Sequence, residues 1–303
     1  MQTFSSPGPI AAVIELQVGD IRVTASDRGN CTVSIRPRDK DRPADVRAAA
    51  AALVEFTNDT LVIRTVKPWQ RLAGATKRDG FIAAEVNLPT ASSLKATTGM
   101  GFVHSEGELA DTIVRTGMGD IRLDQVGALT AKSGLGDVTV DRAAGEAKVT
   151  TSSGSLRLGV LAGTATVKNS NGAVEIDECG RDAHIRAACG DITVGRALTS
   201  LSAVSAMGDI RIAEVSDGSV TARAGAGAID IGVLEGVAAW LEVSARYGSV
   251  RNGLAAAAGP EASDSTVEVR ARTAGGDITI RRAMTARDES TCTNPLSTSS
   301  PVG

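Results

Sequence analysis

Apolar and polar residues alternate along most of this chain in a phrase that recurs about every 18 residues. Each phrase opens on a glycine, and these glycines are Gly101, Gly119, Gly136, Gly154, Gly172, Gly190, Gly208, Gly227, Gly248 and Gly276. The first six spacings are 17 or 18 residues, and the last three lengthen to 19, 21 and 28. A fixed period of this size indicates a solenoid, whose units bury their apolar faces by stacking on one another.

The alternation predicts two strands in each coil. Counting the opening glycine as position 0, apolar residues stand at positions +2 and +4, as in Ile121 and Leu123. A second apolar pair stands at positions −7 and −5, as in Leu129 and Ala131. A period of two is typical of a strand with one buried face. Position +7 is also apolar, as at Cys179, and we interpret it as a corner residue that closes the core.

These strands predict an all-β fold, a flattened parallel β-solenoid with about 18 residues per coil. Equivalent strands of successive coils pair at roughly 4.8 Å, so about nine turns make a rod roughly 45 Å long. We expect a right-handed coil because parallel β crossovers nearly always have that hand. A left-handed hexapeptide helix needs an aliphatic residue every six positions, and Leu156, Ala162 and Lys168 break that rule.

The chain divides into three parts by this pattern. Residues 1–98 do not keep the period and are predicted to form a β-rich N-terminal cap on the solenoid repeats of residues 99–282. Within the cap we expect one short helix over Ala44–Ala52, a hairpin turning at Asn58 and Asp59, and a strand through the sequence GFIAAEVNL. Residues 67–80 read as a polar loop, and residues 283–303 as a disordered tail.

Composition and charge narrow the function classes. The chain has two Trp, one Tyr and four Phe, so its core must be built from Val, Ile, Leu and Ala. A net charge of −3 does not indicate the positively charged surface that nucleic-acid binding needs, and we expect no nucleic-acid partner. The first residues lack the pattern of a signal peptide, and no run of 18 apolar residues occurs. We therefore expect a cytoplasmic protein without membrane insertion.

The four cysteines form no CxxC pair, which predicts reduced thiols rather than a zinc site or a disulfide framework. Cys179 and Cys189 fall in apolar rows of the repeat and are expected to behave as small core residues. Cys292, in the tail, is expected to be the most reactive thiol.

A row of aspartates follows the opening glycines at position +1, and its members are Asp20, Asp120, Asp137, Asp191, Asp209 and Asp277. Calcium-binding nonapeptide solenoids carry an aspartate every nine residues. Here the spacing is doubled and Ser155 and Ala173 interrupt the row, so we expect neither calcium nor another metal or cofactor. We expect each glycine to supply a backbone angle that a Cβ forbids, and each aspartate to bond its own turn.

A second acidic row at position +5 holds Asp124, Asp141 and Asp177 and is broken at Gly159 and Gly195. Neighbouring coils would place Asp124 and Asp141 about 5 Å apart, which suits a carboxylate pair. Polysaccharide-cleaving enzymes built on β-helices also cluster acids on one face. No Lys or His is in register beside the pair, however, and aromatic platforms for sugars are missing. We therefore predict no catalytic residues and treat the row as a speculative ligand site.

Five phrases of the sequence are similar to those of a known family: VGDIRVTASDRGN, VKNSNGAVEI, GDITVGRAL, GVAAWLEVSARYGSVRN and VEVRARTAGGDITIRRA. Between residues 10 and 283 the chain resembles the bacterial β-strand-repeat proteins of a domain-of-unknown-function class labelled "putative adhesins". The resemblance implies a repeat-containing all-β fold with no established activity and no catalytic residues to carry over.

The sequence thus favours a non-enzymatic β-solenoid scaffold that binds a partner, expected to be a protein, through a strand face or an uncovered end. The alternative is a carbohydrate-binding or carbohydrate-active solenoid that uses the row of Asp124, Asp141 and Asp177. Self-association is a separate expectation, because the parallel edges at the ends of a solenoid can pair with another copy.

Overall fold

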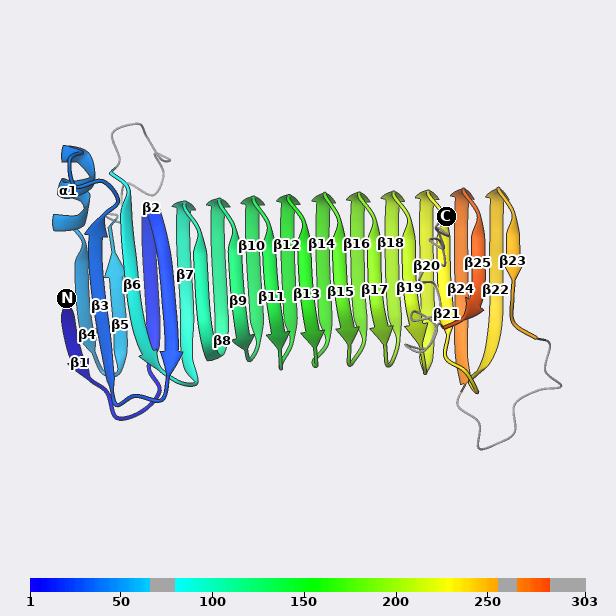
Figure 1. Ribbon diagram of the computed structural model, residues 1–303, viewed down its shortest axis with the longest axis horizontal. Coiled ribbons are helices and arrows are strands. Elements are labelled where there is room, and N and C mark those ends of the chain that lie inside the picture. Colours follow the sequence, from blue (N-terminus) through cyan, green and yellow to red (C-terminus); the bar gives the residue numbers. More distant parts are fainter. Residues whose placement is uncertain (66–79, 256–265, 284–303) are drawn as a thin grey trace, which may run out of the picture.

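The computed structural model describes residues 1–65, 80–255 and 266–283. In this part of the chain 25 strands join in one sheet that coils into a straight rod, and one helix lies beside its N-terminal end (Figure 1). The predicted all-β fold, a parallel β-solenoid, is confirmed.

The N-terminal elements are β1 (Gln2–Ser5), β2 (Ala11–Ser26), β3 (Asn30–Pro37), α1 (Pro43–Ala50), β4 (Leu53–Thr57), β5 (Thr60–Arg64), β6 (Ile82–Pro89), β7 (Ser92–Met100) and β8 (Val103–Met118). The repeats continue as β9 (Ile121–Val126), β10 (Leu129–Leu135), β11 (Val138–Ala143), β12 (Ala147–Ser153), β13 (Leu156–Leu161), β14 (Ala165–Asn171), β15 (Val174–Cys179), β16 (Ala183–Cys189), β17 (Ile192–Ala197), β18 (Leu201–Met207), β19 (Ile210–Val215), β20 (Gly218–Ala226) and β21 (Ile229–Val233). The last elements are β22 (Ala238–Tyr247), β23 (Val250–Asn252), β24 (Thr266–Gly275) and β25 (Ile278–Arg282).

Each coil contributes one strand to each of two layers. We call the layer that contains β10, β12, β14, β16, β18 and β20 face A, and the layer that contains β9, β11, β13, β15, β17, β19 and β21 face B. Equivalent positions pair in parallel register, so Val149 has Ala131 and Val167 as its Cα partners. The residues at positions −7, −5, +2, +4 and +7 are buried in these coils, as predicted, except that Leu234 at position +7 of the last of them is only partly buried. The core is therefore a narrow column of aliphatic side chains between the two faces.

The last two coils are exchanged in space relative to their order in the chain. Strand β20 pairs with β24 rather than with β22, and β21 pairs with β25. Strands β22 and β23 pair with the far sides of β24 and β25 and form the end of the rod, as Figure 1 shows. The prediction that equivalent strands of successive coils pair with one another is therefore wrong at this end. The lengthened spacings before Gly248 and Gly276 mark the place of the exchange.

The coil geometry begins before the first glycine of the repeat series. Strand β2 runs through both faces, pairing with β7 before Gly19 and with β8 after it. On its other side β2 pairs in parallel with β5 and β6, and the antiparallel strands β3 and β4 follow at the N-terminal end. We keep the division into residues 1–98, 99–282 and 283–303 as a proposal about domain organisation.

The local predictions for the N-terminal part are confirmed with small shifts of their ends. The helix spans Pro43–Ala50, and the hairpin between β4 and β5 turns at Asn58 and Asp59, both of which have positive φ. That pair of angles is typical of a two-residue hairpin turn. Asp45 is buried in the first turn of α1, where its carboxylate accepts the backbone N–H of Phe81 at 2.9 Å. The loop predicted for residues 67–80, with Trp69, and the tail with Cys292 lie almost entirely outside the described residues.

A ladder of buried polar side chains runs along the turns at position −3, which the sequence analysis did not single out. Each donates a hydrogen bond to the carbonyl of the glycine in the preceding coil, at 2.9 Å from Thr273 to Gly227 and at 3.0 Å from Thr98 to Gly19. The other members are Thr116, Ser133, Thr151, Asn169 and Ser205. A buried carbonyl without such a partner destabilises a fold, so this ladder holds successive turns together.

Candidate functional site

The aspartates at position +1 form a second ladder, and it connects coils rather than closing single turns. Oδ1 of Asp137 accepts the backbone N–H of Ser155 at 2.8 Å, and Oδ1 of Asp191 accepts that of Asp209 at 2.8 Å. Asp20, Asp120, Asp209 and Asp277 bond the next coil in the same way. The prediction that each aspartate bonds its own turn is therefore wrong, because the nearest free N–H belongs to the same position of the adjacent coil.

Two of these carboxylates have perturbed acidity. Burial raises the pKa of Asp20, although the N–H of Phe102 acts in the opposite direction. The N–H of Ser249 holds the pKa of Asp277 below its usual value. Both carboxylates have a structural role, because one oxygen of each already accepts a hydrogen bond from a backbone N–H.

The row predicted as a speculative ligand site lies on face B. Asp124, Asp141 and Asp177 stand on β9, β11 and β15, and Gly159 of β13 separates the last two. Asp124 is not free, because its Oδ2 accepts the backbone N–H of Gly107 at 3.0 Å and so fixes the irregular pairing of β8 with β9. Asp141 and Asp177 are exposed and line an open hollow of about 250 Å³ together with Arg157 and Glu175.

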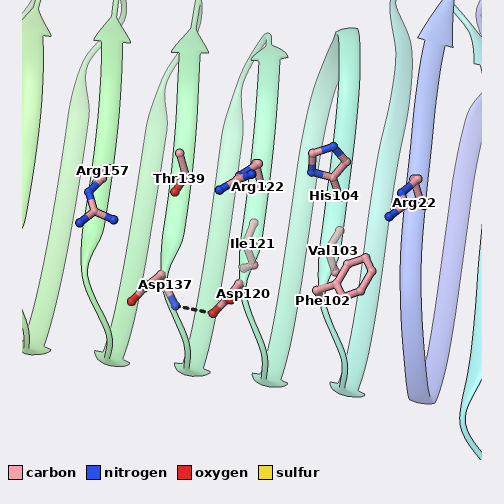
Figure 2. A pocket seen from close by; sticks show the side chains of 10 residues that line it. All are labelled: Arg22, Phe102, Val103, His104, Asp120, Ile121, Arg122, Asp137, Thr139 and Arg157. Carbon is pink, nitrogen blue, oxygen red and sulfur yellow. Dashed lines mark hydrogen bonds between the residues drawn. The ribbon is translucent and has the colours of Figure 1, made fainter.

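A larger hollow of about 390 Å³ lies nearer the N-terminal end of face B. Figure 2 shows Arg22, His104, Arg122, Thr139 and Arg157 in one row across it, with the hydrogen bond from Asp137 to Asp120 below them. Nε2 of His104 lies 3.0 Å from Oε1 of Glu106, and the guanidinium of Arg22 lies 5.8 Å from the ring centre of Phe102. The row presents three arginines, one histidine and one threonine hydroxyl, with aspartates along one border.

Metal-binding side chains do not gather in this protein over the ranges 1–65, 80–255 and 266–283: no three His, Cys, Asp or Glu side chains there are close enough to hold an ion. His104 and His184 lie on opposite faces, on β8 and β16. Cys31 and Cys179 are buried, and burial raises their thiol pKa values to about 11 and about 12. Nucleophilic chemistry by either thiol is disfavoured, because the thiolate is the reactive form.

Cys189 does not belong to the core, contrary to the sequence-based prediction. It is half-buried, and the other apolar residues at position −1 point to solvent, where Leu135 is 48% and Met207 57% exposed. The alternation of β16 continues only to position −3, and the chain then turns at the glycine, so position −1 leaves the buried layer. Apolar character alone did not reveal that change of direction.

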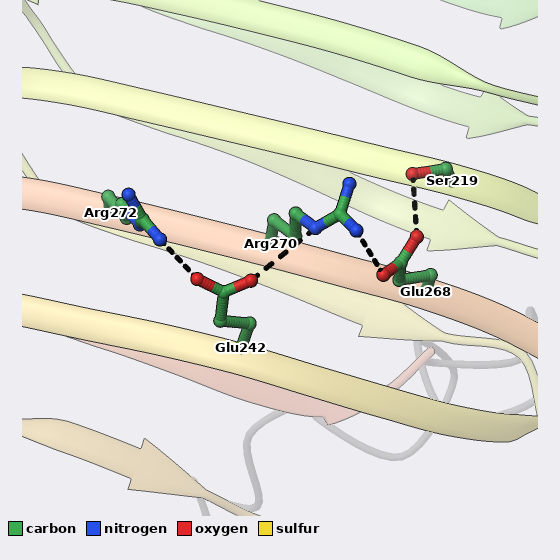
Figure 3. Close-up of polar contacts among 5 residues, drawn as sticks. All are labelled: Ser219, Glu242, Glu268, Arg270 and Arg272. Atoms are coloured by element: carbon green, nitrogen blue, oxygen red, sulfur yellow. Dashed lines mark hydrogen bonds and ion pairs between the residues drawn. The ribbon is translucent and has the colours of Figure 1, made fainter.

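The exchanged coil is held by a cluster of charges that the sequence analysis also missed. Arg270 and Arg272 of β24 both contact the carboxylate of Glu242 on β22, and Glu268 of β24 accepts a hydrogen bond from Ser219 of β20 (Figure 3). The Arg272 side chain, which donates to Glu242, lowers the pKa of that carboxyl. The cluster connects three strands in the order β20, β24, β22 and so favours the exchanged arrangement.

A search for candidate membrane spans finds no helix of sufficient length and hydrophobicity in the described part of the chain.

Comparison with known proteins supports the resemblance seen in the sequence. No curated protein matches the chain. Among solved structures, a "putative adhesin" from Bacteroides fragilis shares 12% identity and a TM-score of 0.30, covering 92% of this chain and 95% of that one. A "putative lipid binding protein" from Parabacteroides distasonis shares 12% identity and a TM-score of 0.37 over the same shares of the two chains. The family model described as Toastrack DUF4097 matches residues 12–283, and the chain thus belongs to this bacterial family of unknown function.

Proposed function

We propose that this protein is a non-enzymatic scaffold that binds another protein through the end of its solenoid. The observation that carries the proposal is the outer coil formed by β22 and β23. Its inward-facing residues Leu241 and Val243 are only partly buried, whereas Val269 and Ala271 of the next coil are fully buried. Within the described residues no strand pairs with the outer edge of β22. An exposed strand edge of this kind accepts an added strand from a partner.

The side chains of this end suit a protein partner. Trp240, Tyr247 and Val250 are 73%, 69% and 48% exposed. Aromatic side chains are enriched at protein interfaces because they bury a large apolar area and can also make a polar contact. We call Trp240, Leu241, Val243, Tyr247 and Val250 the end surface.

The proposal is tested by chemical cross-linking in native lysate with three forms of the full chain. These are the wild type, the pair Trp240→Lys and Val250→Lys, and the matched pair Leu135→Lys and Met207→Lys. The control pair adds the same charge at exposed apolar positions in the middle of the rod. We expect a defined partner with the wild type and the control, and its loss with the end pair. Equal capture by all three forms would contradict binding through the end surface.

A carbohydrate-binding role for the row of Asp124, Asp141 and Asp177 is the second candidate. One observation favours it: Asp141 and Asp177 line the same open hollow on face B. If this row binds sugars, a glycan that is retained by the wild type should be released by Asp141→Ala, and the end pair should bind it normally. Turnover of a polysaccharide lost in Asp141→Ala would turn the proposal toward an enzyme.

A further inference from the structure

Face A carries a row of cations at position −4 that the net charge of the chain conceals. The row runs through seven consecutive coils, and we call it the basic row: Arg115, Lys132, Thr150, Lys168, Arg186, Val204 and Arg223. Every member is the Cα partner of the next, across β8, β10, β12, β14, β16, β18 and β20. All five cations are exposed. At roughly 4.8 Å per coil the row is roughly 29 Å long.

These cations have no acidic partner within the described residues. Ion pairs on face A are made instead by residues outside the basic row, such as Lys148 with Glu146 and Arg270 with Glu242. Figure 3 shows how acids neutralise the arginines of β24, which lies just beyond Arg223. In the coils of the basic row the acids Asp111, Glu146 and Asp182 stand at the border of the face, at position −8. The like charges of neighbouring coils therefore repel one another until a polyanion lies across them.

The rows beside the cations fit a sugar chain. Position −2 carries only small residues in these coils, namely Gly117, Gly134, Ser152, Ser170, Ala188, Ala206 and Gly225. Because these side chains are short, the surface beside the basic row is lower than the row itself. Hydroxyls from Thr130, Thr166, Ser202 and Thr221 stand on the other side, at position −6. Thr166, Lys168 and Arg186 line an open hollow of about 330 Å³ on this face. Hydroxyl groups can donate to and accept from sugar hydroxyls, while Lys and Arg bind carboxylates or sulfates.

We propose that face A binds a linear acidic polysaccharide along the basic row. Single-stranded nucleic acid is disfavoured because its usual stacking platforms are Phe, Tyr and Trp, and the outward positions of β10, β12, β14, β16 and β18 carry none of these three residues. Duplex DNA is disfavoured because a flat sheet face enters neither groove. Face B also carries exposed arginines, at Arg122, Arg157 and Arg211, but the aspartates at positions +1 and +5 of these coils flank them and oppose an anionic ligand, so we expect the polysaccharide to bind on face A. The inference rests on the proposed scaffold role but uses a surface distinct from the end surface.

The test uses polygalacturonate as the probe, at low and at physiological salt. The first variant of the full chain carries Lys132→Thr, Lys168→Thr and Arg186→Thr, and threonine already occupies this row at Thr150. The matched control carries Arg122→Thr, Arg157→Thr and Arg211→Thr on face B, where Thr139 and Thr193 occupy the same row. Both variants remove three positive charges from exposed strand positions. Unchanged circular dichroism and melting of both variants establish that they are folded.

We expect at least a tenfold loss of affinity for the first variant, less than a twofold loss for the control, and weaker binding at higher salt. Wild-type protein that fails to bind at low salt, or an equal loss in both variants, would overturn the proposal. Tighter binding to a DNA duplex or to phosphatidylserine vesicles, lost in the first variant alone, would overturn it in favour of those ligands. The end pair Trp240→Lys and Val250→Lys should bind polygalacturonate normally, so failure of this inference is distinguishable from failure of the end surface as a protein site.

Discussion

At the scale of single residues, three positions of the repeat hold one coil to the next wherever the residue there is the glycine, polar or aspartate residue of the pattern. The glycine at position 0 has positive φ, the polar residue at −3 donates to the preceding glycine carbonyl, and the aspartate at +1 accepts an N–H from the adjacent coil. The glycine is required for two reasons. At Gly276 φ is 140°, and a Cβ would lie 2.2 Å from the carbonyl oxygen of Gly227. Both the backbone angle and the close approach exclude a larger residue.

Two adjacent glycines therefore give a matched pair of substitutions. Gly276→Ala should lower the free energy of unfolding by about 1–3 kcal/mol or more, because it adds backbone strain and a steric clash. Gly275→Ala should change it by less than about 0.5 kcal/mol, because a Cβ there meets no atom within 4 Å. Urea denaturation followed by circular dichroism measures both values. Similar destabilisation by the two substitutions would show that the turn geometry is not the cause.

Cys179 predicts a pH dependence of stability. Its thiol pKa rises from 9.0 to about 12 because burial disfavours the thiolate. Below pH 9 the thiol is protonated in the folded and the unfolded chain, so its contribution to stability is fully present. Above pH 9 only the unfolded chain ionises, and this contribution is lost as the pH rises toward about 12. Cys179→Ala, which copies Ala143 and Ala197 of the same row, should flatten the decline.

The measurement for Cys179 is the difference in free energy of unfolding between wild type and Cys179→Ala from pH 8 to 11. Taking the difference removes the contribution of every other ionisable group, because both proteins share those groups. The loss for the wild type relative to the variant should grow with pH. Parallel curves for the two proteins would contradict burial of Cys179 as the cause.

At the scale of elements, the period of the sequence was sufficient to predict the strands and their buried positions. Period two marked both strands of a coil, and the hairpin at Asn58 and Asp59 was identified by its turn residues. The bonds from the position +1 aspartates to the adjacent coil and the ladder at −3 were not predicted, because a repeat shows which residues recur but not which coil they bond. For the speculative ligand site, the strand register was sufficient to predict that Asp141 and Asp177 lie on the same face. The hydrogen bond between Asp124 and Gly107 could not be predicted, because it depends on a local irregularity in the pairing of β8.

The pattern of apolar and polar residues could not predict the exchange of the last two coils. All coils carry the same apolar positions, so β22 and β24 fit against β20 equally well by hydrophobicity alone. The side chains that distinguish them are polar: Glu268 contacts Ser219, and Glu242 contacts Arg270 and Arg272. Such pairs contribute little to overall stability when they are exposed, but they can select one order of strands over another.

Engineered disulfides test the order of these strands. Thr221 and Arg270 are Cα partners on β20 and β24, so Thr221→Cys with Arg270→Cys should form a disulfide under mild oxidation. Stacking in chain order would instead bring Thr221 beside Glu242. The pair Thr221→Cys and Glu242→Cys should therefore remain unlinked, because one strand separates the two residues. Peptide mapping by mass spectrometry identifies the bonds, and linkage of the second pair alone would disprove the exchange.

At the scale of the whole molecule, the rod has two chemically different faces and two different ends. The N-terminal end carries antiparallel strands and α1, whereas the C-terminal end presents β22 and β23 (Figure 1). Face B carries the aspartate rows, and face A carries the basic row. The net charge of −3 is a sum over both faces, so it does not reveal that acidic and basic side chains lie on different faces. The two proposed surfaces are distinct, so we expect that a partner at the end and a polyanion along face A can be bound at the same time.

The open end also predicts association of two copies. Two rods related by a twofold axis bring β22 of one copy beside β22 of the other in antiparallel register, which satisfies unpaired edge groups and buries Trp240 and Val250. Sedimentation velocity over a range of concentrations should show a monomer–dimer equilibrium, weakened at least tenfold by Trp240→Lys with Val250→Lys. Leu135→Lys with Met207→Lys should leave it unchanged. Because the dimer would cover the surface proposed for the protein partner, rising protein concentration should reduce partner capture, and a wild-type protein that stays monomeric at high concentration would exclude this competition.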